Sequence, residues 1–163
     1  MVRGHGLKTD DVKRVKIQVQ DHEAAIVDNR DMPDICLQHL IAVMLLDGTV
    51  TFASSHDEAR MKDRKVLELR KKIEFVGSAR LTRAGGRQAV VEVWTRGGGH
   101  FMHHTQAVKG TSANPMTRAE VDEKCVDLLG PILGRKKTRN LVDAVWELER
   151  VKDIRSLRPL LQA

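Results

Sequence analysis

Residues 34–48, DICLQHLIAVMLLDG, constrain the fold of this chain more than any other segment. Between the two aspartates of this segment, every position is apolar except the neighbours Gln38 and His39. A helix that is hydrophobic on nearly all sides is buried between other layers of structure. We therefore predict a buried helix over 33–46 that ends before Gly48, where a left-handed cap is favoured.

Strand patterns lie on both sides of this helix in the sequence. VKRVKIQV, residues 12–19, alternates apolar and polar positions and predicts a half-buried strand. Three further strands are expected at 72–82, 87–96 and 100–108, and the glycine-rich breaks RAGGR and RGGGH favour tight antiparallel turns between them. We predict an antiparallel meander there, and a short strand at Thr49–Phe52.

Helical patterns occupy the rest of the chain. Short helices are expected over 57–70, with Val66, Leu67 and Leu69 facing the core. Thr117 and Glu120 have the capping-box spacing that opens a helix. From that point the expected elements are helices alone, at 118–129, 138–150 and 153–161.

This order of elements predicts an α+β fold. A small antiparallel-sheet domain with a buried helix is expected over 1–116, followed by a helical segment over 117–163. Three short amphipathic helices need a surface to pack against, because a bare apolar face marks an interface. Either they cover the sheet or their partner surface lies outside this chain.

Composition limits the classes of protein and partner. The chain has 163 residues, 41% of them hydrophobic, and a formal charge of +6, which favours anionic partners. Its two cysteines, Cys36 and Cys125, lie in apolar helical patterns and indicate free thiols in a reducing compartment. Neither a signal peptide nor a membrane-spanning run is recognisable, so we expect a cytoplasmic protein that does not contact membranes.

Three stretches, LQHLIAVMLLDG, VKGTSANPMTRAEVDEKCVDLLGPILG and LVDAVWELERVKDIRSLRPLL, together resemble the C-terminal part of the MmgE/PrpD family. That family includes 2-methylcitrate dehydratase and cis-aconitate decarboxylase. Its members combine a large all-helical domain with a smaller α+β lid, and their final helices return to the large domain. The resemblance implies that 1–116 is the lid and that 117–163 belongs to the helical domain.

The resemblance also implies an activity and what the chain lacks for it. The family's active-site lysine and further histidines would lie before residue 1, so we expect this chain to be inactive alone. We expect a lyase of propionate metabolism that acts on a small di- or tricarboxylate without a cofactor. The chain would form a homodimer or associate with the missing helical domain. Dehydration, decarboxylation and epimerisation are not distinguished.

His39 is the candidate catalytic residue, with Gln38 beside it as a candidate substrate-binding residue. On a helix His39 shares a face with apolar residues, so burial should keep the imidazole neutral near pH 7. One interpretation is a core histidine paired with a carbonyl or carboxylate. The other interpretation is that His39 faces an active-site cleft at the boundary of the lid. The resemblance implies it, since decarboxylase-like members have an active-site tyrosine at this position, and in this chain, which has no tyrosine, His39 keeps a proton-bearing group there.

Lys109, Thr111 and Asn114 are further candidate substrate-binding residues, because they lie where a strand connects to a helix. Donors there could bind a carboxylate, and a simple turn with a helix cap is the alternative. HFMHH, residues 100–104, is not expected to bind metal, since at most two of its histidines share a strand face and zinc needs three or four ligands.

The basic run between Arg60 and Lys72 has two interpretations. Interleaved acidic residues favour a solvated helical face. Nucleic-acid binding would require stacking aromatic residues, and only Phe75 is near, so we expect no nucleic-acid partner.

Besides the lyase hypothesis, a second function stays open for the chain, that of a non-catalytic interaction module that uses the C-terminal helices.

Overall fold

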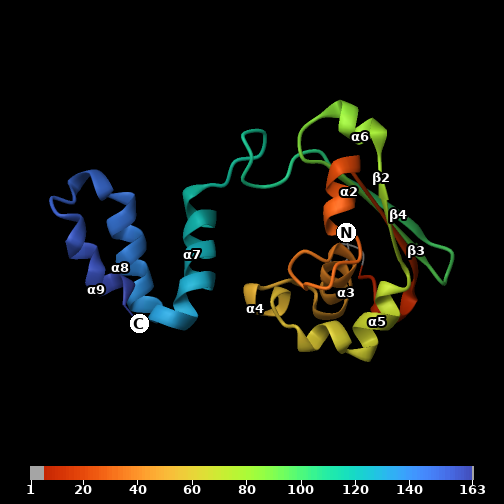
Figure 1. Cartoon of the computed structure of the whole chain (residues 1–163), viewed down its shortest axis with the longest axis horizontal. Coiled ribbons are helices and arrows are strands. Elements are labelled where there is room, and N and C mark those ends of the chain that lie inside the picture. Colours follow the sequence, from red (N-terminus) through yellow and green to blue (C-terminus); the bar gives the residue numbers. More distant parts are fainter. Residues whose placement is uncertain (1–5, 163) are drawn as a thin grey trace. The chain divides into compact units, whose positions relative to one another are not determined.

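The structure is a computed structural model that describes residues 6–162 (Figure 1). It divides into an N-terminal unit, Met1–Val108, and a C-terminal unit, Lys109–Ala163, each of which is described by itself. The division lies earlier in the chain than the predicted boundary between 116 and 117. Of the two predicted domains, residues 1–5 and 163 lie outside the described residues.

The N-terminal unit is built on one four-stranded sheet with the order β2-β1-β3-β4. The strands are β1 Val12–Val19, β2 Ile73–Gly77, β3 Ala89–Thr95 and β4 His100–Thr105. β1 pairs with β2 in parallel and with β3 antiparallel, and β3 and β4 form an antiparallel hairpin. The predicted β1 strand, the hairpin and the α+β class are confirmed.

The predicted meander of three consecutive strands is wrong at its first member. The expected strand 72–82 ends at Gly77, and helix α6, Ala79–Ala84, follows it. Ser78 caps this helix by accepting a hydrogen bond from the backbone N–H of Leu81 at 3.4 Å, and the Leu81 side chain is buried. In the sheet, β1 lies between β2 and β3, so these two strands do not pair as a meander would require. The residues of β2 indicate a strand, but they do not indicate which strand it pairs with.

Helices fill the connection between the parallel strands β1 and β2. They are α2 Asp21–Val27, α3 Leu37–Asp47, α4 Phe52–Ser55, η2 Ala59–Lys62 and α5 Arg64–Arg70. A further short helix, η1 Thr9–Asp11, precedes β1. The buried helix is confirmed as α3, although it begins at Leu37 rather than 33. It ends at Gly48, which has a left-handed backbone with φ 71°.

Two local predictions near α3 fail. The expected strand at Thr49–Phe52 is replaced by α4, because Thr51 and Ser54 form a reciprocal capping box. Leu67 on α5 is 39% exposed, whereas Val66 and Leu69 are buried as predicted. α2 was not predicted from the sequence.

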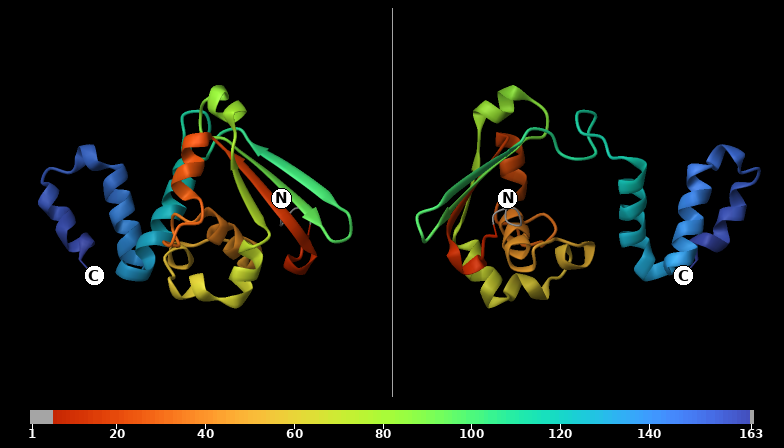
Figure 2. Two further views of the ribbon diagram at one scale, coloured as in Figure 1. Left: turned by 45° about the vertical axis from the view of Figure 1, so that its right-hand side comes forward. Right: turned by 180° about the vertical axis from the view of Figure 1, so that it is seen from behind.

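The core of the N-terminal unit lies between the sheet and helices α3 and α5, which Figure 2 shows on one side of the strands. Its buried members come from β1, β2, β3, α3 and α5, and they include Val15, Ile17, Val43, Val66 and Val93. α3 therefore has the sheet on one side and α5 on another, which explains its apolar sequence.

The C-terminal unit contains helices alone. They are α7 Arg118–Leu133, α8 Arg135–Trp146, η3 Leu148–Arg150, η4 Ile154–Leu157 and α9 Arg158–Leu161. The predicted capping box is present, since Thr117 accepts from the backbone of Glu120 and the Glu120 side chain accepts from the backbone of Thr117. α7 continues through Pro131 to Leu133 instead of ending near 129.

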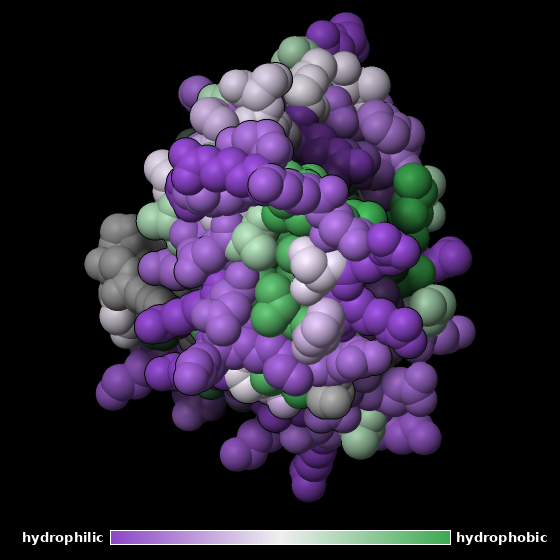
Figure 3. Space-filling view, turned by 90° about the vertical axis from the view of Figure 1, so that its left-hand side faces the viewer, coloured by the Kyte–Doolittle hydropathy of each residue, from purple (hydrophilic) through white to green (hydrophobic). Residues whose placement is uncertain are grey.

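Large apolar side chains are exposed on the C-terminal unit. They are Ile132, Val145, Trp146, Leu148, Ile154 and Leu161. Figure 3 shows hydrophobic side chains at the surface among hydrophilic ones. Across residues 6–162, none of the helices has the length and apolar character needed to cross a membrane.

Candidate functional site

His39 lies in the third position of α3 and is fully buried, with 0% of its surface exposed. Neither ring nitrogen, Nδ1 or Nε2, has a hydrogen-bond partner among the described residues. Buried polar side chains normally have a partner, so an unpartnered imidazole is an exception that requires an explanation. The interpretation as a core histidine satisfied by a carbonyl or carboxylate finds no such partner in residues 6–162.

The surroundings of His39 keep its imidazole neutral. Burial lowers the pKa of His39 from its usual 6.5, and the charges of Arg70 and Arg60 lower it further. Asp57 acts in the opposite direction, as the smallest of these effects. A neutral imidazole at pH 7 has one nitrogen that can accept a proton and one N–H that can donate a hydrogen bond.

Arg60, on η2, is the second residue of this site. Its Nη2 donates to Asp47 Oδ1 at 2.7 Å, while its buried Nε has no partner among the described residues. Within residues 6–162, every buried side-chain nitrogen or oxygen without a partner belongs to His39 or Arg60. The N-terminal unit therefore contains an imidazole and a guanidinium whose buried nitrogens have unused hydrogen-bonding capacity, and a guanidinium is well suited to pairing with carboxylates.

Sequence reasoning assigned Arg60 to a solvated face and did not predict its ion pair with Asp47. The contact that orients Arg60 comes from Asp47 at the end of α3, and helix α4 separates the two residues along the chain. No periodicity in the basic run signals that contact. The contact becomes apparent only in the folded chain, where η2 lies close to the end of α3.

Gln38 is 2% exposed and its side chain is engaged within the N-terminal unit. Its Oε1 accepts from the backbone N–H of Asn29 at 3.0 Å, and its Nε2 donates to Asp28 Oδ1. Asn29 has φ 44°, a left-handed backbone that side chains rarely adopt. Gln38 therefore fixes the loop before α3, and its predicted contact with substrate stays a prediction.

Lys109, Thr111 and Asn114 lie in the C-terminal unit, so the predicted site residues are divided between the two units. Lys109 pairs with Glu120, which lowers the pKa of Glu120 to about 2, together with hydrogen bonds from Thr117. Thr111 and Asn114 are bridged through the backbone, with Asn114 N–H donating to Thr111 O at 3.0 Å. These are the contacts of a turn and a helix cap, and anion binding by these three residues stays a prediction.

The histidines of β4 have separate partners. His100 Nε2 lies 3.1 Å from Glu92 Oε2, and His104 Nε2 lies 2.9 Å from Gln88 Oε1, while His103 is exposed. Over the described part of the chain, no group of three or more histidine, cysteine or acidic side chains is placed to hold a metal ion.

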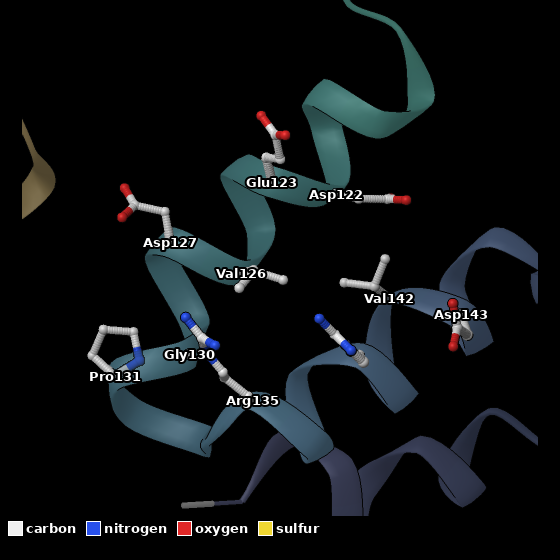
Figure 4. Close-up of a pocket in the computed structure, with 10 residues that line it drawn as sticks. Asp122, Glu123, Val126, Asp127, Gly130, Pro131, Arg135, Val142 and Asp143 are labelled. Atoms are coloured by element: carbon white, nitrogen blue, oxygen red, sulfur yellow. The ribbon is translucent and has the colours of Figure 1, made fainter.

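A groove of about 770 Å³ lies between α7 and α8 (Figure 4). Val126 and Val142 point toward one another across it, and its rim carries acidic and arginine side chains. The charged residues are Asp122, Glu123, Asp127, Arg135, Arg139 and Asp143. It contains neither a histidine nor any of the predicted site residues, so we do not assign catalysis to it.

Comparison with known proteins identifies one family. A search of curated proteins finds no match to the chain. The model of the MmgE/PrpD C-terminal domain matches residues 1–148, which include the N-terminal unit and helices α7 and α8. The chain therefore belongs to the MmgE/PrpD family and contains its C-terminal domain.

Proposed function

We propose that this chain is the C-terminal part of a lyase of the 2-methylcitrate dehydratase type, with a small di- or tricarboxylate as substrate. The observation that supports the proposal best is the buried His39 side chain, whose two nitrogens have no partner in residues 6–162. The family match includes the segment that carries this residue.

The chemistry of dehydration explains the use of such a group. A base must remove the proton α to a carboxylate, and an acid must protonate the departing hydroxyl. Held neutral, His39 can act as the base that takes the proton α to the carboxylate. The imidazolium formed in that step can then give the same proton to the departing hydroxyl, which leaves as water. The guanidinium of Arg60 would hold a substrate carboxylate during that transfer. Since the imidazole is fully buried, it must become accessible to the substrate in the assembled enzyme.

The remaining catalytic groups come from a helical domain outside this sequence, according to this proposal. The exposed apolar side chains of the C-terminal unit support it, because they offer a surface for such a domain or for a second copy of the chain. The chain alone is then inactive.

The test is complementation. The chain is mixed with the separately produced helical domain of an MmgE/PrpD enzyme, and the formation of an unsaturated acid from 2-methylcitrate or citrate is followed by its ultraviolet absorption. Release of CO₂ from cis-aconitate is measured in parallel to detect decarboxylation. We expect turnover in the mixture and none in either component.

His39→Gln should lower kcat in the active mixture by about 10²- to 10⁴-fold, the usual contribution of a general acid or base. His103→Gln is the matched control, because His103 is an exposed histidine of the same unit. An unchanged kcat in His39→Gln would remove His39 from the mechanism. Turnover by the chain alone would contradict the requirement for a second domain.

A second candidate function is a non-catalytic interaction module. The exposed apolar residues on helices α7, α8 and η4 favour it, since they require no catalytic group. The complementation test separates the two, because a module would bind the helical domain without any turnover.

A further inference from the structure

The N-terminal unit has a cavity lined by residues of the loop before α3, η2, α5 and β2, and His39 is not among its lining residues. Its volume is about 640 Å³, and its lining includes Asn29, Lys62, Arg64, Arg70 and Lys71. We propose that this cavity binds a small polyanion, with two or more carboxylate or phosphate groups. The proposal does not depend on the lyase activity.

The charge balance of the cavity carries the first part of the argument. Four cationic side chains line it against a single carboxylate, that of Glu68. Glu68 accepts from Lys71 Nζ at 2.7 Å, and this contact lowers the pKa of Glu68. Among the described residues, Lys62, Arg64 and Arg70 form no ion pair. Their mutual repulsion would be relieved by an anion in the cavity.

The wall formed by Asn29 is held in place before any ligand binds. Asn29 is the one non-glycine residue with positive φ among residues 6–162, and asparagine tolerates that backbone better than most residues. The buried Gln38 side chain accepts its N–H, and Arg70 Nη2 donates to its Oδ1 at 3.4 Å. A left-handed residue that is held by side-chain contacts from two helices is a feature found at ligand sites.

The lining also indicates the class of ligand. Leu67 and Ile73 supply apolar surface, so the cavity is suited to a compact molecule with a carbon skeleton or a phosphate group. It contains no aromatic side chain on which a base could stack, which disfavours nucleic acid.

Isothermal titration calorimetry of the purified full chain tests the proposal, with citrate, pyrophosphate and inorganic phosphate as separate probes and glycerol as the uncharged control. We expect saturable binding of citrate or pyrophosphate, and the stronger of the two identifies the anionic group preferred. Amide chemical-shift changes in the bound chain should centre on Asn29 and residues 62–71. Shifts centred elsewhere, or no binding of any anion, would overturn the proposal.

Paired double variants separate a site from a merely basic surface. Lys62→Gln with Arg64→Gln removes two exposed cavity charges, and we expect at least a tenfold loss of affinity. Lys13→Gln with Arg80→Gln removes the same charge from exposed positions elsewhere in the unit, and should change affinity less than twofold. Equal losses in the two double variants, or tighter binding of single-stranded DNA than of either small anion, would overturn the proposal.

Discussion

At the scale of single residues, the burial of the unpartnered His39 side chain should lower the stability of the fold. A buried imidazole without hydrogen-bond partners costs free energy, because both nitrogens lose their contacts with water and gain none. Gln38, its neighbour in sequence, has the opposite character, since both ends of its amide are paired. Two adjacent polar residues in one apolar helix therefore have different roles, one in the reaction we propose and one in holding a loop.

His39→Leu should raise the free energy of unfolding by about 1–2 kcal/mol at pH 7, since an apolar side chain of similar size removes the unpaired polar atoms. The two proteins should also differ in pH dependence. The pKa of His39 is lowered in the fold, so below pH 6.5 the unfolded chain binds more protons than the folded one. Unmutated protein should lose stability relative to His39→Leu as pH falls through 6.5.

Urea unfolding at several pH values, followed by circular dichroism, measures both effects. Parallel pH profiles for the two proteins would show that His39 has the same pKa in both states. A less stable His39→Leu would show that the imidazole makes contacts that the structure of residues 6–162 does not contain.

At the scale of elements, the ends of the helices follow local chemistry closely. α7 begins at its capping box, α4 at another, and α3 ends at a left-handed glycine. Pairing of the strands does not follow local chemistry, since β2 lies beside β1 although the hairpin β3–β4 is nearer in sequence. In this chain the residues that cap a helix lie within a few positions of its end, whereas the order of the strands depends on contacts between distant segments.

Gly48→Ala should destabilise the N-terminal unit by about 1 kcal/mol, because alanine is strained at φ 71°. Gly97→Ala is the matched control, since it lies in the turn after β3 with open space around the added methyl group and no positive φ. Thermal unfolding of the two variants compares them directly. Equal melting temperatures would show that the end of α3 relaxes without cost.

At the scale of the whole molecule, large apolar side chains are exposed on the described part of the short C-terminal unit, while few of its residues are buried. α7 has no fully buried residue, and the buried residues of the unit are few: Thr138, Leu141, Val142 and Leu157. This distribution supports the proposal that a second copy or another domain covers these helices.

Ile154→Lys should weaken association, because it places a charge on the exposed apolar surface of the C-terminal unit. Analytical ultracentrifugation over a range of concentrations should show a larger monomer fraction, or weaker binding of the helical domain, than in the unmutated chain. Ile26→Lys is the control, since Ile26 is 59% exposed in the N-terminal unit and Ile154 is 63% exposed. Equal effects of the two substitutions would contradict an interface on the C-terminal helices.

The sequence by itself determined the burial of α3 and of His39, the strand β1, the β3–β4 hairpin, the capping box of α7 and the α+β class. These features depend on side-chain periodicity and on turn or cap residues a few positions apart, so they can be recognised locally. The parallel pairing of β2, the contact of Arg60 with Asp47, and the cavity beside Asn29 were decided by the tertiary structure alone. Each of these joins residues from different elements, and no local pattern encodes which elements meet when the core of the N-terminal unit forms.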